Sequence, residues 1–209
     1  MKEGQFITLE GGEGVGKSTN LTFIKQLLEE AGITVVTTRE PGGTAFAENI
    51  RQILLDNREE SVSDNAELLM MFAARAQHIK HVIKPALAKG IWVLCDRFTD
   101  ATYAYQGGGR GMDNSVIAWL ENFIQEGLRP DLTLLLDAPV QVGMHRAAQR
   151  GALDRFESEK IAFFESVRQA YLGIAQQQPE RVKVIDATQN LDDVQASISA
   201  VMMHLCAHE

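Results

Sequence analysis

The residues with the clearest chemical potential form the segment GGEGVGKS, Gly11–Ser18, directly after the apolar stretch QFITLE. The segment matches G-x-x-x-x-G-K-[ST], the pattern of a loop that binds polyphosphates between a strand and a helix. Glycine at positions Gly11, Gly14 and Gly16 permits backbone conformations that turn N–H groups toward phosphate oxygens. The pattern also predicts that Lys17 reaches the β- and γ-phosphates. The loop therefore indicates a bound nucleoside triphosphate, without saying how that triphosphate is used.

A divalent cation is expected beside this loop. The Ser18 hydroxyl is placed to ligate Mg²⁺, and a helix predicted over 18–31 points its positive end at the same phosphates. Asp96 and Asp137 each end an apolar run, IWVLCD and LTLLLD, where a carboxylate can approach the cation. The alternative for both is a carboxylate that only caps a turn. Arg97, directly after Asp96, favours the functional interpretation at that position.

Three clusters of polar residues suggest a second anion. TREPGG, Thr38–Gly43, follows the second predicted strand, and DRF, Asp96–Phe98, follows the third. Ligands of parallel sheets bind outside the carboxyl ends of the strands. RAAQRGALDR, Arg146–Arg155, lies between two predicted helices and is dense in guanidinium groups. A small P-loop protein can be a GTPase switch, a motor module or a kinase of small molecules. The N-K-x-D guanine motif is absent from the sequence, and the clusters favour transfer to a small anion.

The elements that position these residues alternate along the chain. Short apolar runs rich in β-branched residues read as parallel strands covered on both faces. Between them lie helical stripes, for example over 161–174 and 191–205, with Asn190 as the expected cap of the last helix. The pattern predicts one doubly wound α/β domain with a five-stranded parallel sheet. The predicted strands are Gln5–Leu9, Ile33–Thr37, Ile91–Cys95, Leu132–Leu136 and Val182–Ile185.

Composition limits the remaining classes. The chain has 209 residues, of which 45% are hydrophobic and 23% charged, typical of one globular domain. A formal charge of −8 argues against a broad nucleic-acid-binding face, so anions must be met by local clusters of Arg and Lys. Cys95 and Cys206 match neither the spacing of a metal site nor that of a redox motif. We expect both to be small, buried apolar residues, and the protein to be in a reducing compartment. Neither a signal-peptide pattern nor a long apolar span is visible, so we expect no membrane partner and a cytoplasmic location.

Five motifs in order make the sequence closely similar to bacterial thymidylate kinases. They are GGEGVGKS, TREPGGT, LLMMFAARAQH, DRFTDATYAYQGGGR and RGALDRFE, and the similarity continues to IDATQNLDDV. The resemblance implies the P-loop nucleoside monophosphate kinase fold, with 1–209 as a single domain and a short lid at about 146–157. It implies Mg²⁺-dependent transfer of the γ-phosphate of ATP to dTMP, in dTTP synthesis. It also implies a homodimer. A kinase of another nucleoside monophosphate and a nucleotide-switched binding protein stay open as alternatives.

The chemistry of that reaction suits a chain without an obvious general base. A nucleoside monophosphate is largely dianionic near neutral pH, because its second pKa is about 6. The obstacle is the repulsion between two polyanions, on the order of 4 kcal/mol for two unit charges about 4 Å apart at an effective dielectric near 20. Mg²⁺, Lys17 and several arginines must offset repulsions of this order.

The resemblance assigns the donor and transfer roles. It implies that Arg97 holds the acceptor phosphate and that Glu13 approaches the 3′-hydroxyl of the deoxyribose. Another subtype has Arg where this chain has Gly14, so the lid arginines Arg150 and Arg155 are expected to supply the missing charge. The implied catalytic residues are Lys17, Asp96, Arg97, Arg150 and Arg155, with Ser18 and Asp96 at the metal. The implied ATP-binding residues are Gly11, Gly12, Glu13, Gly14, Val15, Gly16, Lys17, Ser18, Thr19 and Arg146.

The resemblance also places dTMP. Arg75 is expected to donate to the O4 carbonyl of thymine, and Tyr105 to close against the 2′ carbon. The stacking aromatic of the family lies four residues before this Arg, where the chain has Met71; either Phe72 substitutes for it or Met71 packs under the base. The implied dTMP-binding residues are Glu13, Arg39, Glu40, Pro41, Phe72, Arg75, Arg97, Thr102, Tyr105 and Gln106.

Three further segments have competing interpretations. Gly107–Gly109 and Gly111 predict a mobile loop beside the site. Either this loop has a direct role at the site, or its glycines only make it flexible. His78 and His81 share a helix but lack the spacing and carboxylate of a zinc motif. The apolar helix Ala66–Ile83 can present a self-complementary face for a dimer or can belong to the core.

Overall fold

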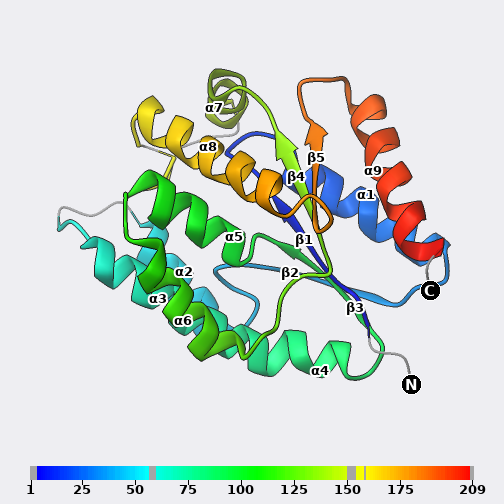
Figure 1. Cartoon of the computed structure of the whole chain (residues 1–209), viewed down its shortest axis with the longest axis horizontal. Helices are drawn as coiled ribbons and strands as arrows, with labels where there is room; N and C mark the ends of the chain where they lie inside the picture. Colours follow the sequence, from blue (N-terminus) through cyan, green and yellow to red (C-terminus); the bar gives the residue numbers. More distant parts are fainter. Residues whose placement is uncertain (1–3, 57–59, 150–153, 158, 208–209) are drawn as a thin grey trace.

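The computed structural model describes residues 4–56, 60–149, 154–157 and 159–207. Within these residues, the strands form one parallel sheet in the order β2-β3-β1-β4-β5 (Figure 1). All five predicted strands are present, and each ends one or two residues beyond its predicted end. The reason is that the polar residues after each apolar run, such as Arg39 and Asp96, still pair with the neighbouring strand. Their bounds are β1 Phe6–Glu10, β2 Val35–Arg39, β3 Trp92–Asp96, β4 Leu132–Asp137 and β5 Val182–Asp186.

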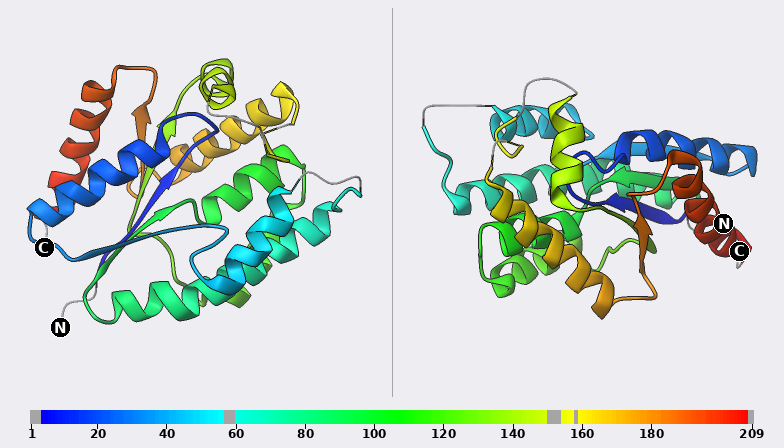
Figure 2. Two further views of the ribbon diagram at one scale, coloured as in Figure 1. Left: turned by 180° about the vertical axis from the view of Figure 1, so that it is seen from behind. Right: turned by 90° about the horizontal axis from the view of Figure 1, so that it is seen from above.

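Helices cover both faces of this sheet (Figures 1 and 2). α1 (Lys17–Glu30) and α9 (Leu191–Ala207) pack together on one face, over a core that includes Ile24, Leu28 and Ile198. The other helices lie on the opposite face or around the carboxyl edge. They are α2 Ala45–Leu55, α3 Asp64–His78, η1 Ile79–Ile83, α4 Lys84–Leu87, α5 Thr99–Thr102, η2 Tyr103–Gly109, α6 Asn114–Gln125, α7 Val140–Ala148 and α8 Ile161–Gln177. The doubly wound α/β prediction is confirmed.

Local signals explain where two of the helices begin. α1 starts after Gly16, which has φ +92°, a left-handed conformation that glycine adopts without steric cost. α9 starts after Asn190, whose side-chain oxygen accepts a hydrogen bond from the N–H of Asp193 at 3.0 Å. Asn190 is therefore the cap that the sequence predicts. None of the helices in the described part of the chain is both long and apolar enough to cross a membrane.

Strand register brings three loops together at the carboxyl edge of the sheet. Leu9 of β1 and Arg39 of β2 both align with Asp96 of β3. Backbone pairing continues past the strands: the N–H of Arg97 donates to the carbonyl of Leu9 at 3.0 Å, and the N–H of Glu40 donates to that of Asp96 at 2.9 Å. β1 lies between β3 and β4, the switch point where ligands bind in such sheets.

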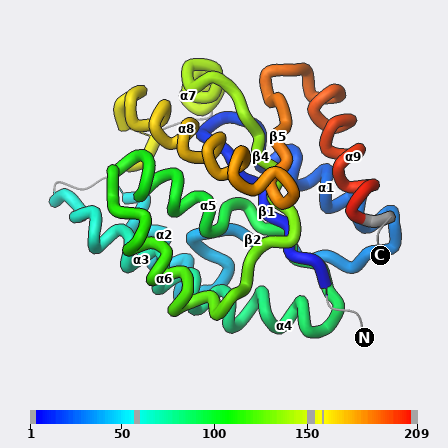
Figure 3. The backbone as a smooth tube through the Cα atoms, in the orientation of Figure 1, coloured from blue at the N-terminus to red at the C-terminus, as the bar shows by residue number. Residues whose placement is uncertain are grey.

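The glycine-rich segment is helical rather than a loop, which corrects the expectation for Gly107–Gly109. These residues lie in η2, which runs beside α8 (Figure 3). A Cβ on Gly108 would lie 2.9 Å from the carbonyl oxygen of Ser166, and one on Gly109 would collide with the Phe163 ring. Gly108 and Gly109 therefore allow η2 and α8 to approach each other closely. Gly111 lies after the end of η2 and has a φ of +72°.

Candidate active site

The phosphate loop has the backbone that its glycines predict. Gly11, Gly14 and Gly16 have φ values of +138°, +67° and +92°. α7 packs directly against the loop: a Cβ on Gly14 would collide with the carbonyl of Gly143. This close contact leaves no room for the arginine that the other subtype carries at this position. Val15 is buried in the core, so only its backbone is available to a phosphate.

Lys17 is buried beneath the same loop. Its ammonium donates to the carbonyl oxygens of Gly11 at 3.2 Å and Gly12 at 2.6 Å. Burial lowers the pKa of Lys17, and repulsion from the Arg97 guanidinium lowers it further, while Glu13 opposes both. The loop thus holds a desolvated cation at the start of α1, where its attraction to phosphate is strengthened.

The predicted magnesium residues line one groove. Ser18 of α1 and Asp96 of β3 both line it, together with Thr38 and Arg39. The Oδ1 atom of Asp96 is buried and has no hydrogen-bond partner among the described residues. Mg²⁺ binds to few protein oxygens and keeps several waters, so one carboxylate and one hydroxyl fit it. Asp137 instead forms a two-pronged ion pair with Arg168, both distances being 2.8 Å, which favours the structural interpretation of that carboxylate.

A second pocket, called the acceptor pocket below, borders the same loop at Glu13. Seven of the ten residues expected to bind dTMP line it or its floor: Glu13, Glu40, Pro41, Arg97, Thr102, Tyr105 and Gln106. The remaining lining residues are not among the predicted dTMP contacts, apart from Met71 as an alternative to Phe72. They are Arg51, Leu55, Met71, Phe98, Ala101, Asp154 and Phe156.

Arg97 joins this pocket to the phosphate loop. Its guanidinium donates to the carbonyl of Gly11 at 2.9 Å and to Glu13 at 2.7 Å, and it lies 4.8 Å from the centre of the Tyr105 ring. The Tyr105 hydroxyl donates to the same Glu13 carboxylate at 2.6 Å. Arg97 itself has φ +68°, a conformation that is uncommon outside glycine. The partner of Arg97 is therefore the phosphate loop, rather than a surface acid.

Arg97 is connected to the buried carboxylate of Glu10 through the hydroxyl of Tyr171. Glu10, the last residue of β1, accepts hydrogen bonds from the N–H of Phe98 at 2.6 Å and from the hydroxyl of Tyr171 at 2.7 Å. Tyr171 in turn accepts from Arg97 at 3.2 Å. Burial, assisted by the nearby Asp100, raises the pKa of Glu10 to about 8. No motif of the sequence marks Tyr171, which falls on the apolar stripe of α8 like any core aromatic.

Arg75 is fixed by an internal network. It donates to Glu40 at 2.7 Å, to the Thr102 hydroxyl at 2.9 Å and to the carbonyl of Phe98 at 3.2 Å. His78 contacts the other oxygen of Glu40 at 2.9 Å, so this histidine supports an ion pair. No cluster of His, Cys, Asp or Glu suited to a metal occurs among the described residues. The Nη1 atom of Arg75 is buried without a hydrogen-bond partner in the described part of the chain.

Phe72 lies outside the pocket, contrary to its expected place among the substrate contacts. It packs in the core with Leu68, Ile117 and Leu120, and its ring lies 4.8 Å from the Arg75 guanidinium. Met71, one position earlier, lines the pocket. Of the two alternatives, the structure favours Met71, because a shift of one residue turns a helical side chain by about 100°.

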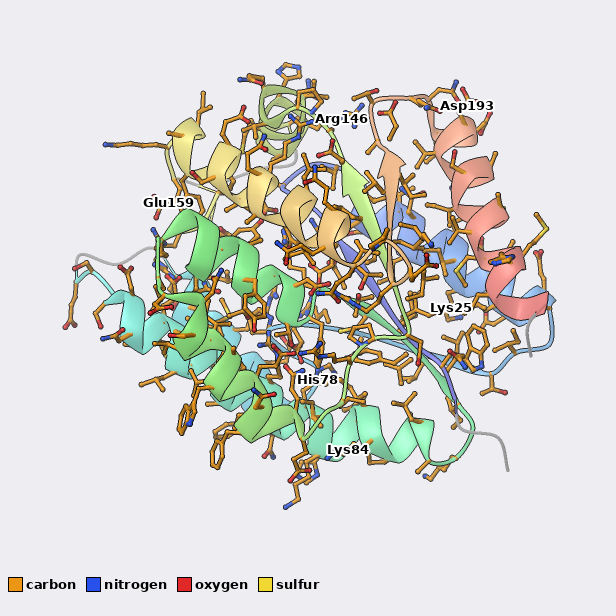
Figure 4. The ribbon with its side chains drawn as sticks, viewed as in Figure 1. Lys25, His78, Lys84, Arg146, Glu159 and Asp193 are labelled. Atoms are coloured by element: carbon orange, nitrogen blue, oxygen red, sulfur yellow. The ribbon has the colours of Figure 1, made fainter. Side chains whose placement is uncertain are left out.

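The remaining predicted arginines do not line the acceptor pocket as far as the structure describes them. Arg39 is exposed and pairs with Glu48 at 2.8 Å, and it lines the groove of Ser18 and Asp96 instead of the acceptor pocket. Arg146, on α7, donates to the carbonyl of Ala187 at 3.1 Å (Figure 4). Arg155 pairs with Glu67 at 2.6 Å, and Arg150 lies outside the described residues. Thr19 is exposed on α1.

Arg51 is a residue that the sequence analysis missed. It lines the acceptor pocket and donates to the carbonyl of Pro41 at 3.0 Å. Burial lowers its pKa, and the neighbouring Arg39 lowers it further, as expected where several cations face one anion site. Its signal in the sequence was weak, because a single arginine in an amphipathic helix is usually a surface residue.

Comparison with known proteins identifies the family. A family model described as thymidylate kinase matches residues 9–198. The thymidylate kinase of Ectopseudomonas mendocina (strain ymp) is 61% identical over 202 residues, covering 97% of this chain and 96% of that protein. That of Pseudomonas putida (strain GB-1) is 61% identical over 199 residues, covering 95% of each. A crystal structure of thymidylate kinase from Ehrlichia chaffeensis superposes with a TM-score of 0.78 at 32% identity, covering 96% of this chain and 99% of that one. With its phosphate loop, its switch-point pocket and these relatives, the chain belongs to the thymidylate kinase family.

Proposed function

We propose that this protein is a thymidylate kinase that transfers the γ-phosphate of ATP to dTMP, giving ADP and dTDP. The observation that carries the proposal is the place of Arg97. Its guanidinium lines the acceptor pocket and is bonded to Gly11 and Glu13 of the phosphate loop. A phosphate held by Arg97 therefore lies beside the loop that holds the triphosphate.

The chain's own residues supply the charge that the transfer needs. Lys17, held by the carbonyls of the phosphate loop, would meet the donor phosphates, and the planar fork of Arg97 suits the acceptor phosphate. The acceptor is already an anion at neutral pH and needs no general base. Mg²⁺, when bound, neutralises the β- and γ-phosphates, and Ser18 and Asp96 would hold it.

Recognition of thymine rests on donors around the pocket. Thr102 and Gln106 line it. Arg75 does not line it, but it donates to three residues that do, Glu40, Phe98 and Thr102. We assign Arg75 to the O4 carbonyl and Met71 to the apolar face of the base. Tyr105, fixed by Glu13, would exclude a 2′-hydroxyl. A single domain over 1–209, a lid at about 146–157 that carries Arg150, and a cytoplasmic location remain predictions.

Coupled measurement of ADP release with dTMP, dUMP, UMP, CMP, AMP and GMP tests the function. We expect kcat/KM to be highest with dTMP and release without an acceptor to be slow. A purine monophosphate as the best acceptor would refute the assignment. Slow hydrolysis that dTMP does not stimulate would support the nucleotide-switched alternative instead.

We also propose that the protein is a homodimer. Large apolar side chains are exposed on the neighbouring helices α2, α3 and α6, and Trp119 and Phe123 stack with ring centres 5.6 Å apart. Leu69 and Ala73 are exposed on the expected Ala66–Ile83 face, while Leu68, Phe72, Ile79 and Ile83 belong to the core. The exposed residues are Phe46, Ile53, Leu69, Val116, Trp119 and Phe123. Exposed apolar surface of this kind marks association sites.

Light scattering on a sizing column tests the dimer. We expect twice the chain mass of 23.1 kDa for the unmodified protein and a single chain mass for Trp119→Glu/Phe123→Glu. Met203→Glu, at an equally exposed apolar position on α9, is the control and should remain dimeric. An unmodified protein that elutes as a monomer at micromolar concentration would contradict the proposal.

A further inference from the structure

Glu67 is a fully buried carboxylate that no motif of the sequence singled out. It lies in the first turn of α3. Three side chains donate to it: Gln106 from η2 at 2.8 Å, Arg155 at 2.6 Å, and Arg110 at 3.3 and 3.4 Å. The donors come from segments 39, 43 and 88 residues away along the chain. One carboxylate therefore ties together three parts of the fold.

Both guanidiniums beside Glu67 are paired with carboxylates. Arg155 pairs with Glu67, while Arg110 pairs with Glu67 and Glu159 and faces the exposed Asp64 at 3.7 Å. Glu159 precedes α8 (Figure 4). The two arginines also lie over aromatic rings, Arg155 at 4.4 Å from the centre of Phe156 and Arg110 at 4.8 Å from that of Phe163. A buried network that is fully paired holds its members in one geometry.

Two of the groups held by Glu67 shape the acceptor pocket. Gln106 lines the pocket directly. Arg155 does not, but its neighbours on both sides, Asp154 and Phe156, do. Arg155 is also fastened to α2, where its Nε donates to the carbonyl of Leu54 at 2.8 Å and its N–H donates to that of Leu55 at 3.2 Å.

We infer that Glu67 is a positioning residue for dTMP binding: its carboxylate orients Gln106 and, through Arg155, holds Asp154 and Phe156 against the acceptor pocket. The inference rests on the proposed function and deepens it. It changes the expected role of Arg155, whose guanidinium is engaged by Glu67, Leu54 and the Phe156 ring rather than by the phosphate loop. Arg155 then acts in ground-state binding of the acceptor, and the transfer step relies on other cations.

Steady-state kinetics of Glu67→Gln, with dTMP binding measured by calorimetry in the absence of ATP, tests this inference. We expect the KM and Kd for dTMP to rise about tenfold, since a charged hydrogen-bond network is lost. The KM for ATP should stay within about twofold, and kcat should fall less than about threefold. A purely structural role would instead lower the active fraction, hence the apparent kcat, and leave both KM values unchanged.

Asp64→Asn is the matched control. Asp64 lies on the same turn of α3 and faces Arg110 at 3.7 Å, but it is exposed. This variant should keep all three parameters within about twofold of the unmodified enzyme, since exposed ion pairs contribute little.

Arg155→Met supplies a second test if Glu67→Gln does not fold, because it leaves Glu67 paired with Arg110. The inference requires a higher Kd for dTMP with kcat nearly unchanged. A fall in kcat of about a hundredfold with an unchanged Kd would make Arg155 a transition-state residue and overturn the inference. An unmodified enzyme that binds dTMP but does not phosphorylate it would refute the proposed function, while the Kd comparison would still decide the role of Glu67.

Discussion

The acceptor pocket and the phosphate loop hold their charges in different ways. Around the acceptor pocket, arginines pair with carboxylates from distant segments: Arg97 with Glu13, Arg75 with Glu40 and Arg155 with Glu67. At the loop, Lys17 donates to two carbonyls of the loop itself. The charges of the acceptor pocket are thus held by the tertiary fold, whereas the lysine of the donor site is held by the one continuous segment to which it belongs.

This difference has an energetic consequence. A buried pair that loses one partner leaves an uncompensated charge, so changes at the acceptor pocket affect stability together with binding. Lys17 forms no direct carboxylate pair among the described residues; its hydrogen bonds go to two neutral carbonyls, and the charges of Arg97 and Glu13 act on it without such a bond. Changes there should affect the chemical step more than the fold.

Lys17→Met gives the largest expected loss of activity. We expect kcat to fall about a thousandfold or more, because a preorganised cation at the transferring phosphate is removed. Thermal denaturation should show a midpoint within a few degrees of the unmodified protein. A large drop in that midpoint would break the contrast between the two regions.

Arg97→Ala should impair both binding and folding. We expect kcat/KM for dTMP to fall about a hundredfold or more, with a smaller change in the KM for ATP. The Glu13 carboxylate loses its charged partner but keeps the Tyr105 hydroxyl, so the free energy of unfolding should fall by about 2 kcal/mol. Urea denaturation beside steady-state kinetics measures both effects. Unchanged kinetics with dTMP would contradict the acceptor role of Arg97.

Glu10 gives the acceptor side a pH dependence. Its pKa is about 8 in the folded protein, against an ordinary value of 4.5, so the folded state binds this proton more tightly. Its contribution to stability is complete below pH 4.5 and is lost as the pH rises through 8, at up to about 1.4 kcal/mol per pH unit. Glu10→Gln removes this titration and should show a shallower slope. Urea denaturation of both proteins between pH 5 and 9 measures the slopes, and parallel curves would contradict the assignment.

Met71→Ala should give the smallest effect. Met71 lines the acceptor pocket, while Phe72 belongs to the core. We expect the KM for dTMP to rise about threefold to tenfold, from lost apolar contact worth about 1 kcal/mol, with a smaller loss of stability than at Phe72, because Met71 is only partly buried against the core. Phe72→Ala should instead destabilise the fold by about 3 kcal/mol. If Phe72→Ala alone raised the Kd for dTMP, the placement of these two residues would be reversed.

Much of the donor site could be predicted from the sequence, because the phosphate loop is formed by neighbouring residues. Eight consecutive residues, Gly11–Ser18, set the turn, the cation and the helix start, and the structure gives the three glycines the conformations that the pattern requires. The strands could also be predicted, since each is a short apolar run followed by a polar residue.

The acceptor side could be predicted only in part. DRF and TREPGG marked Arg97 and Glu40, but Arg51, Glu67 and Tyr171 carried no pattern of their own. The motif predicts Phe72 or Met71 beside the base. The rotation of about 100° per helical residue puts Met71 in the pocket and Phe72 in the core. Gly107–Gly109 suggested a loop, yet contact with α8 made the segment helical.

The sequence by itself determined the order of strands and helices, the phosphate loop and the family to which the chain belongs, because apolar periodicity and short motifs depend on neighbouring residues. Only the tertiary structure decided which buried carboxylate pairs with which arginine, and which face of α3 meets the pocket. Those choices join residues up to 88 positions apart, such as Glu67 and Arg155. Burial makes such pairings strong, and packing in three dimensions selects them.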